Sequence, residues 1–153
     1  MSEMSKTRIR FYPRSKLPTY LYLISALLSV LLFYWSGIYC SVHRCTSPNS
    51  IEYSRHLIQY FSILAAPLIL FSSIFWLVNA LFYHSNPCIY GYNYMEMPSA
   101  VFSSLLSGIC AVIEIHFSVI EMHELDWNDK WCWAAADAVV LCGVHALVAF
   151  TLQ

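Results

Sequence analysis

The chain has 153 residues, of which 59% are hydrophobic and 11% are charged, and its mean hydropathy is +0.57. A soluble domain carries roughly 25% charged residues, so this composition excludes water as the main solvent. The net charge of -1, with few basic residues, also argues against a protein that binds nucleic acid.

The chain starts with a basic tail at residues 1–16, MSEMSKTRIRFYPRSK, which holds five Lys or Arg residues against the single Glu3. Fewer basic residues follow in the segments between the apolar stretches. Because cytosolic segments of membrane proteins are enriched in Lys and Arg, the N-terminus is predicted to be cytosolic. The apolar run after the tail is longer than the hydrophobic part of a signal peptide and lacks a small-residue cleavage site, which favours a retained anchor.

Four apolar stretches follow, at residues 17–39, 57–83, 98–120 and 131–152. Each has the ~18 to 20 residues needed to cross a hydrocarbon core about 30 Å thick. We therefore expect an all-α protein in which residues 17–153 form one integral membrane four-helix bundle with short loops. Four crossings return the chain to its starting side, so both termini are predicted to be cytosolic.

Two cysteines lie in the first connecting segment, which is predicted to be on the exoplasmic or lumenal side. Cys40 and Cys45 are close enough in sequence to close a tight disulfide loop on this oxidising side. Cys132, at the outer end of the fourth stretch, is a competing partner, and the spacing does not choose between them.

One face of the third stretch is small and polar. On a helical wheel this face holds Ser103, Ser107, Cys110, Glu114, Ser118 and Glu121, with Ser104 and Gly108 beside it. The fourth stretch has a comparable face of Ala134, Ala138, Cys142, His145 and Ala149. Small residues let helix backbones approach closely, and a carboxylate that faces lipid is costly. We expect these faces to pack against other helices, with the third and fourth helices as the tightest pair.

Each of these two stretches carries one carboxylate, Glu114 or Asp137, at a similar number of residues from the turn between them. With a rise of ~1.5 Å per residue, the two groups are predicted to lie at about the same depth and to be neighbours if the faces meet. A charge near the bilayer centre costs ~2.5 to 3.5 kcal/mol. Three forms of compensation stay open: a shared proton, a histidine partner (His116 or His145), or access to water.

Two interpretations of this pair follow. One is a buried polar clamp that fixes helix register, and the other is a site that handles protons or cations. We favour the clamp, because the sequence shows no third intramembrane acid and no basic partner.

Catalytic and cofactor motifs are not evident. The turn EMHELDWNDK is acidic but has neither the spacing of an EF-hand loop nor that of a zinc helix, so we read it as a solvated loop. His116 and His145 lie at different depths, which argues against a haem held between helices. We expect no catalytic residue, metal or cofactor.

Four spans, cytosolic ends, short loops and small-residue helix faces resemble the MARVEL-type tetraspan proteins. This resemblance covers nearly the whole chain and implies a role in membrane apposition, vesicle traffic or cell junctions, at the plasma membrane or an endomembrane. The segment Trp35 to Cys40, followed by Cys45, is similar to the claudin tryptophan and two-cysteine signature, but the loop is too short for the claudin extracellular sheet. Small insect four-span septate-junction proteins have a similar size and layout.

Together these features predict a non-enzymatic tetraspan protein that acts by lateral or cell-cell association. Its expected partners are membrane lipids and other membrane proteins, in a homo- or hetero-oligomer. The alternative is a small proton- or cation-coupled transporter or channel subunit that uses Glu114 and Asp137.

Overall fold

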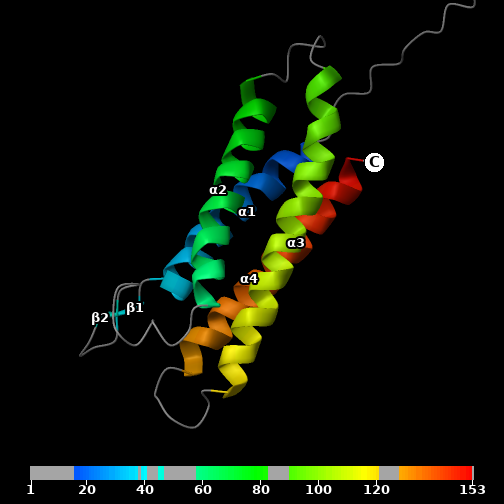
Figure 1. Cartoon of the computed structure of the whole chain (residues 1–153). Helices are drawn as coiled ribbons and strands as arrows, with labels where there is room; N and C mark the ends of the chain where they lie inside the picture. Colours follow the sequence, from blue (N-terminus) through cyan, green and yellow to red (C-terminus); the bar gives the residue numbers. More distant parts are fainter. Residues whose placement is uncertain are drawn as a thin grey trace, which may run out of the picture.

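Four long helices make up nearly all of the computed structural model, which describes residues 16–37, 39–40, 45–46, 58–82, 90–120 and 128–152 (Figure 1). The helices are α1 (Leu17–Gly37), α2 (Gln59–Phe82), α3 (Tyr90–Ile120) and α4 (Asn128–Thr151), and each is long and apolar enough to cross a membrane. A short antiparallel pair, β1 (Tyr39–Cys40) and β2 (Cys45–Thr46), follows α1. The expected all-α, four-span membrane architecture is confirmed.

The helix bounds differ from the expected spans mainly at the start of α3. This helix begins at Tyr90, eight residues before the expected start at Pro98, which lies inside it. Membrane helices accept an internal proline where neighbouring groups satisfy the freed carbonyl, and α2 likewise contains Pro67. The tyrosine-rich segment expected to be a loop is therefore the first part of a helix.

The helices form two hairpins, α1 with α2 and α3 with α4. The α3–α4 contact is the most extensive in the bundle, as expected, and the α1–α2 contact follows. The hairpins join through α1 with α4 and through α2 with α3, the latter being the less extensive seam (Figure 1). We call the end at which α1 begins and α4 ends the proximal end, and the opposite end the distal end.

Buried residues recur along every helix at alternating steps of four and three. They are Pro18, Tyr22, Ser25, Ser29, Leu32 and Ser36 on α1; Ser62, Ala66, Ile69, Ser73, Trp76 and Ala80 on α2; Glu96, Ala100, Ser103, Ser107, Cys110 and Glu114 on α3; and Ala134, Ala138, Leu141, His145 and Val148 on α4. This spacing is typical of helices that pack side by side with a small crossing angle. The bundle interior is consequently stacked in layers.

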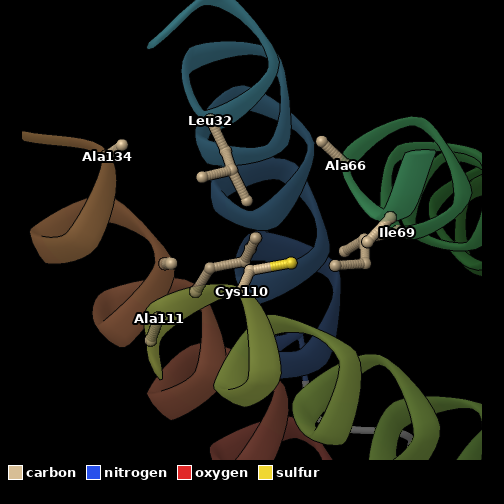
Figure 2. Packing of buried hydrophobic residues seen from close by; sticks show 9 residues of the cluster. Leu32, Ala66, Ile69, Cys110, Ala111 and Ala134 are labelled. Atoms are coloured by element: carbon tan, nitrogen blue, oxygen red, sulfur yellow. The ribbon is translucent and has the colours of Figure 1, made fainter. Parts of the chain in front are cut away.

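Two apolar clusters occupy different depths of the interior. In the distal half, Leu32, Ile69 and Cys110 approach one another from α1, α2 and α3, and Ala138 and Leu141 of α4 belong to the same cluster (Figure 2). In the proximal half, Tyr22, Trp76, Ala100 and Val148 form a second cluster, with one residue from each helix. We call these the distal apolar layer and the aromatic layer.

Outward-facing side chains on the described spans are predominantly apolar, as in Leu64, Phe71, Val112 and Phe150. His116 is an ionisable exception on α3. Such a surface is compatible with lipid and with other membrane helices, while the polar side chains of the spans are mainly inside the bundle.

Candidate functional site

The interior of the bundle carries polar groups in separate layers, and one of these contains Glu114. Its side chain is 0% exposed, and Ser36 on α1 donates a hydrogen bond of 2.8 Å to Glu114 Oε1. Ser62 of α2 is buried at a similar level. The helices bring these residues together because each occupies the inward stripe of its own helix. We call this the glutamate layer, and its hydrogen bond joins the two hairpins.

Asp137 lies near the depth of Glu114 but points elsewhere. Phe117 of α3 packs on Trp131 of α4, with ring centroids 5.6 Å apart. Three residues along each helix from this contact, Glu114 of α3 is level with about Ala134 of α4. Asp137 lies three residues further along α4, which is a rise of roughly 4.5 Å.

The direction of Asp137 follows from the contacts of α4 with α3. Cys142 lies on the α3 side of α4, because the Ser104 hydroxyl donates to its carbonyl at 3.1 Å. Asp137 is about 140° round the helix from Cys142 at 100° per residue. Its side chain is half-buried, and Oδ2 is buried without a hydrogen-bond partner. The two carboxylates thus have similar depth and different surroundings.

A second polar layer, which the sequence did not predict as a unit, lies towards the proximal end. Ser25 Oγ is 2.7 Å from Ser73 Oγ and 2.7 Å from His145 Nε2, and all three side chains are fully buried. Ser103 is buried on α3 at about the same level. Each helix therefore supplies one polar residue, and we call this the serine–histidine layer.

The hydrogen positions in this layer follow from its acceptors. Ser73 Oγ lies 2.8 Å from the carbonyl of Ile69, to which it donates. Ser25 then donates to Ser73, and His145 Nε2–H donates to Ser25. A proton on Nδ1 would have no hydrogen-bond acceptor, so the imidazole is assigned as neutral. Its Nδ1 is an acceptor, and it is buried without a hydrogen-bond partner.

Glu96 is a buried acid that the sequence analysis missed. It is 0% exposed near the start of α3, in a segment that we expected to be a cytosolic loop. It lies eighteen residues before Glu114, which is five whole turns, so both glutamates are on the same stripe about 27 Å apart. Extending the wheel of α3 towards the N-terminus would have found it.

The residues expected on the α3–α4 interface are largely inside the bundle. Ser103, Ser107 and Ala138 are buried, and Ser104 bonds to Cys142 as described. A Cβ built on Gly108 would lie 3.6 Å from Cys142 Sγ, an ordinary contact distance. The buried face of α4 passes through Leu141 and Val148 rather than through Ala149, so it is rotated from the expected face.

The weaker seam between α2 and α3 has its own polar contact. Trp76 Nε1–H donates to Ser99 Oγ at 2.9 Å, and the hydroxyls of Ser72 and Ser99 are 2.9 Å apart. This contact ties the two hairpins together near the aromatic layer, on the opposite side of the bundle from the Ser25–His145 bond.

The structure describes only part of the segments that hold the expected disulfide and the acidic turn. The backbone register pairs Cys40 with Cys45, and opposed residues in an antiparallel pair have Cα atoms about 4.5 to 5.5 Å apart, which a disulfide can span. The disulfide stays a prediction, since the structure does not describe the side chains of Cys40 and Cys45. Cys132 is exposed on α4.

Most of the acidic turn, residues 121–127, is outside the described residues. Within the described part of the chain, no group of three or more His, Cys, Asp or Glu side chains is placed to hold a metal.

Comparisons with protein-family models, with curated proteins and with solved structures give no match. The tetraspan resemblance therefore rests on the four span-length helices, and it does not extend to a particular family such as MARVEL.

Proposed function

We propose that this four-span membrane protein is a non-enzymatic structural component that acts by lateral association with other membrane proteins. The observation that carries the proposal is the use of the interior polar groups. Ser36 with Glu114, Ser25 with His145, and Trp76 with Ser99 each join one hairpin to the other. Polar contacts between membrane helices fix their register, and here they make one rigid unit of two hairpins.

The layered interior also supports a structural role. The distal apolar layer separates the glutamate layer from the serine–histidine layer, and the aromatic layer separates the latter from Glu96. A path for protons or cations needs polar groups or water in succession. Leu32, Ile69 and Leu141 place apolar side chains between the two polar layers, beside the buried hydroxyls of Ser29 and Ser107, and this supports a structural role. The apolar outer surface is then the part of the spans that meets partners within the membrane.

Cross-linking in native membranes tests this proposal. We expect the tagged protein, expressed at low level and cross-linked before solubilisation, to be recovered with discrete membrane neighbours or with further copies of itself. The predicted setting is a plasma-membrane junction or an endomembrane. Recovery of the monomer alone, in membranes where a known oligomer cross-links fully, would contradict lateral association.

A second candidate is a small proton- or cation-coupled transporter or channel subunit that uses Glu114 and Asp137. The observation that favours it is the presence of three acids in or beside the bundle interior, since Glu96 adds to this pair. An ionisable residue inside a membrane is costly and often functional. Proton or cation flux into liposomes that hold the purified protein, lost in Glu114→Gln with the fold retained, would favour this candidate over the structural one.

A further inference from the structure

We propose that the serine–histidine layer is a proton-binding site, in which protonation of His145 weakens the contact between the α1–α2 hairpin and the α3–α4 hairpin. This goes beyond lateral association, because it gives the bundle a state that depends on pH.

His145 is the residue of α4 that takes part in a hydrogen-bonded contact between the two hairpins. It is 0% exposed, and it is held 2.7 Å from Ser25, which is itself 2.7 Å from Ser73. Ser25 and Ser73 both belong to the α1–α2 hairpin, so the imidazole is the sole member of this bonded trio on the other hairpin. A change in the charge of His145 therefore acts directly on the seam between the hairpins.

The hydrogen bonds leave one place for a proton. Ser73 donates to the Ile69 carbonyl, so Ser25 is assigned as the donor to Ser73 and Nε2–H as the donor to Ser25. Nδ1 of His145 has an available lone pair, and it is buried without a partner. Proton uptake at Nδ1 forms an imidazolium, which has only donors. The new N–H then has no acceptor at hydrogen-bond distance, and the positive charge is buried away from water, which disfavours the closed packing.

Among the described residues, no carboxylate is level with the imidazole in the closed bundle. Tyr22 on α1 is one layer away, and the facing residues of α2 and α3 are Ser73 and Ser103. Further titratable groups on the packed helices are Cys110, Cys142, Tyr60, Glu96, Glu114 and Asp137. By helical rise the nearest carboxylate, Glu96, is about 10 Å away along the bundle, with Asp137 at about 12 Å and Glu114 at about 16 Å. Separation of the hairpins would let water or a carboxylate reach the ring.

Two measurements on the full-length protein in lipid nanodiscs test the proposal. The first follows the equilibrium constant for unfolding by SDS or urea between about pH 8 and about pH 5, where histidine changes charge. Below about pH 6.5, the ordinary pKa of histidine, each unit by which the pH falls should increase this constant up to tenfold in the wild type, the limit for uptake of one proton. His145→Gln, which keeps an amide donor for Ser25 but does not titrate in this range, should abolish the increase. His116→Gln is the matched control, because His116 is exposed on α3, and it should behave as the wild type.

The second measurement is the ¹⁵N NMR spectrum of the wild-type protein with labelled histidine rings, which does not depend on the folding of a variant. A neutral ring with the proton on Nε2 is expected at about pH 8, and a doubly protonated ring is expected as the bundle loosens. The proposal is overturned if His145→Gln keeps the pH dependence of the wild type. It is also overturned if the unfolding constant of the wild type is independent of pH, or if the His145 ring becomes doubly protonated in the folded bundle while that constant does not change.

Discussion

Ser36 on α1 and Glu114 on α3 share a hydrogen bond of 2.8 Å, although these two helices lie diagonally across the bundle and otherwise contact each other little. Both side chains are fully buried. The bond gives a buried carboxyl a partner on the opposite hairpin, and it is a direct reason to treat Glu114 as a structural clamp.

A double-mutant cycle on this pair should show coupling. We expect Ser36→Ala and Glu114→Gln each to lower the free energy of unfolding. Their effects should be non-additive by about 0.6 kcal/mol, the average for polar contacts between membrane helices, and by at most about 1.7 kcal/mol. Unfolding by SDS in mixed micelles measures each value. Ser29→Ala is the control, because Ser29 is buried on the same helix and donates to the Ser25 carbonyl of its own helix. We expect the effects of Ser29→Ala and Glu114→Gln to be additive. Additive effects of Ser36→Ala and Glu114→Gln would contradict a structural clamp.

Gly108 and Gly143 should respond differently to enlargement. Gly108→Leu is expected to separate α3 from α4 and to destabilise the bundle, because the added side chain meets Cys142, whereas Gly108→Ala should be tolerated since its Cβ fits at 3.6 Å. A Cβ on Gly143 would have nothing within 4 Å. Gly143→Leu is thus a matched control that should keep monomer stability. Thermal unfolding in detergent compares the variants, and equal melting temperatures for both leucine variants would contradict the interface.

Removal of the Leu141 side chain should cost stability without opening a path for protons. Leu141 is fully buried in the distal apolar layer, so Leu141→Ala should lower the free energy of unfolding by about 2 to 5 kcal/mol. Leu147→Ala, at a position that is 55% exposed on the same helix, should have little effect. A pH-sensitive dye inside liposomes provides the second readout. Proton leak in Leu141→Ala and not in Leu147→Ala would favour the transporter candidate.

The two cysteines of the β1–β2 pair should be joined. Because their backbones are opposed, we expect peptide mapping without reduction to recover Cys40 linked to Cys45. The predicted exoplasmic or lumenal location supplies the oxidising environment. Recovery of Cys132 linked to either cysteine would contradict this pairing.

Much of the helical architecture and part of the interior could be predicted from the sequence. Length and hydropathy define four spans, and the period of α3 places Ser103, Ser107, Cys110 and Glu114 on one stripe, which is the stripe that the structure buries. Helical period is a local property, so it does not depend on the neighbours.

Partners across the bundle could not be predicted in the same way. Ser36 and Glu114 are 78 residues apart, and Ser25 and His145 are 120 residues apart, so each pairing depends on the register between helices. The serines of α1 form a stripe as clear as that of α3. Serine is uncharged and common in membrane helices, so this stripe alone does not predict which polar partner each serine has. Glu96 lies outside the expected span, which starts at Pro98, whereas the chain is already helical from Tyr90.

The order in which the chain is made gives the serine–histidine layer another consequence. Ser25 and Ser73 lie on the first two helices and can pair as soon as both have left the ribosome, but His145 arrives with the last helix. Ser36 similarly has to wait for Glu114 of the third helix. A nascent chain that stops before α4 therefore presents polar groups to the lipid in its first three helices.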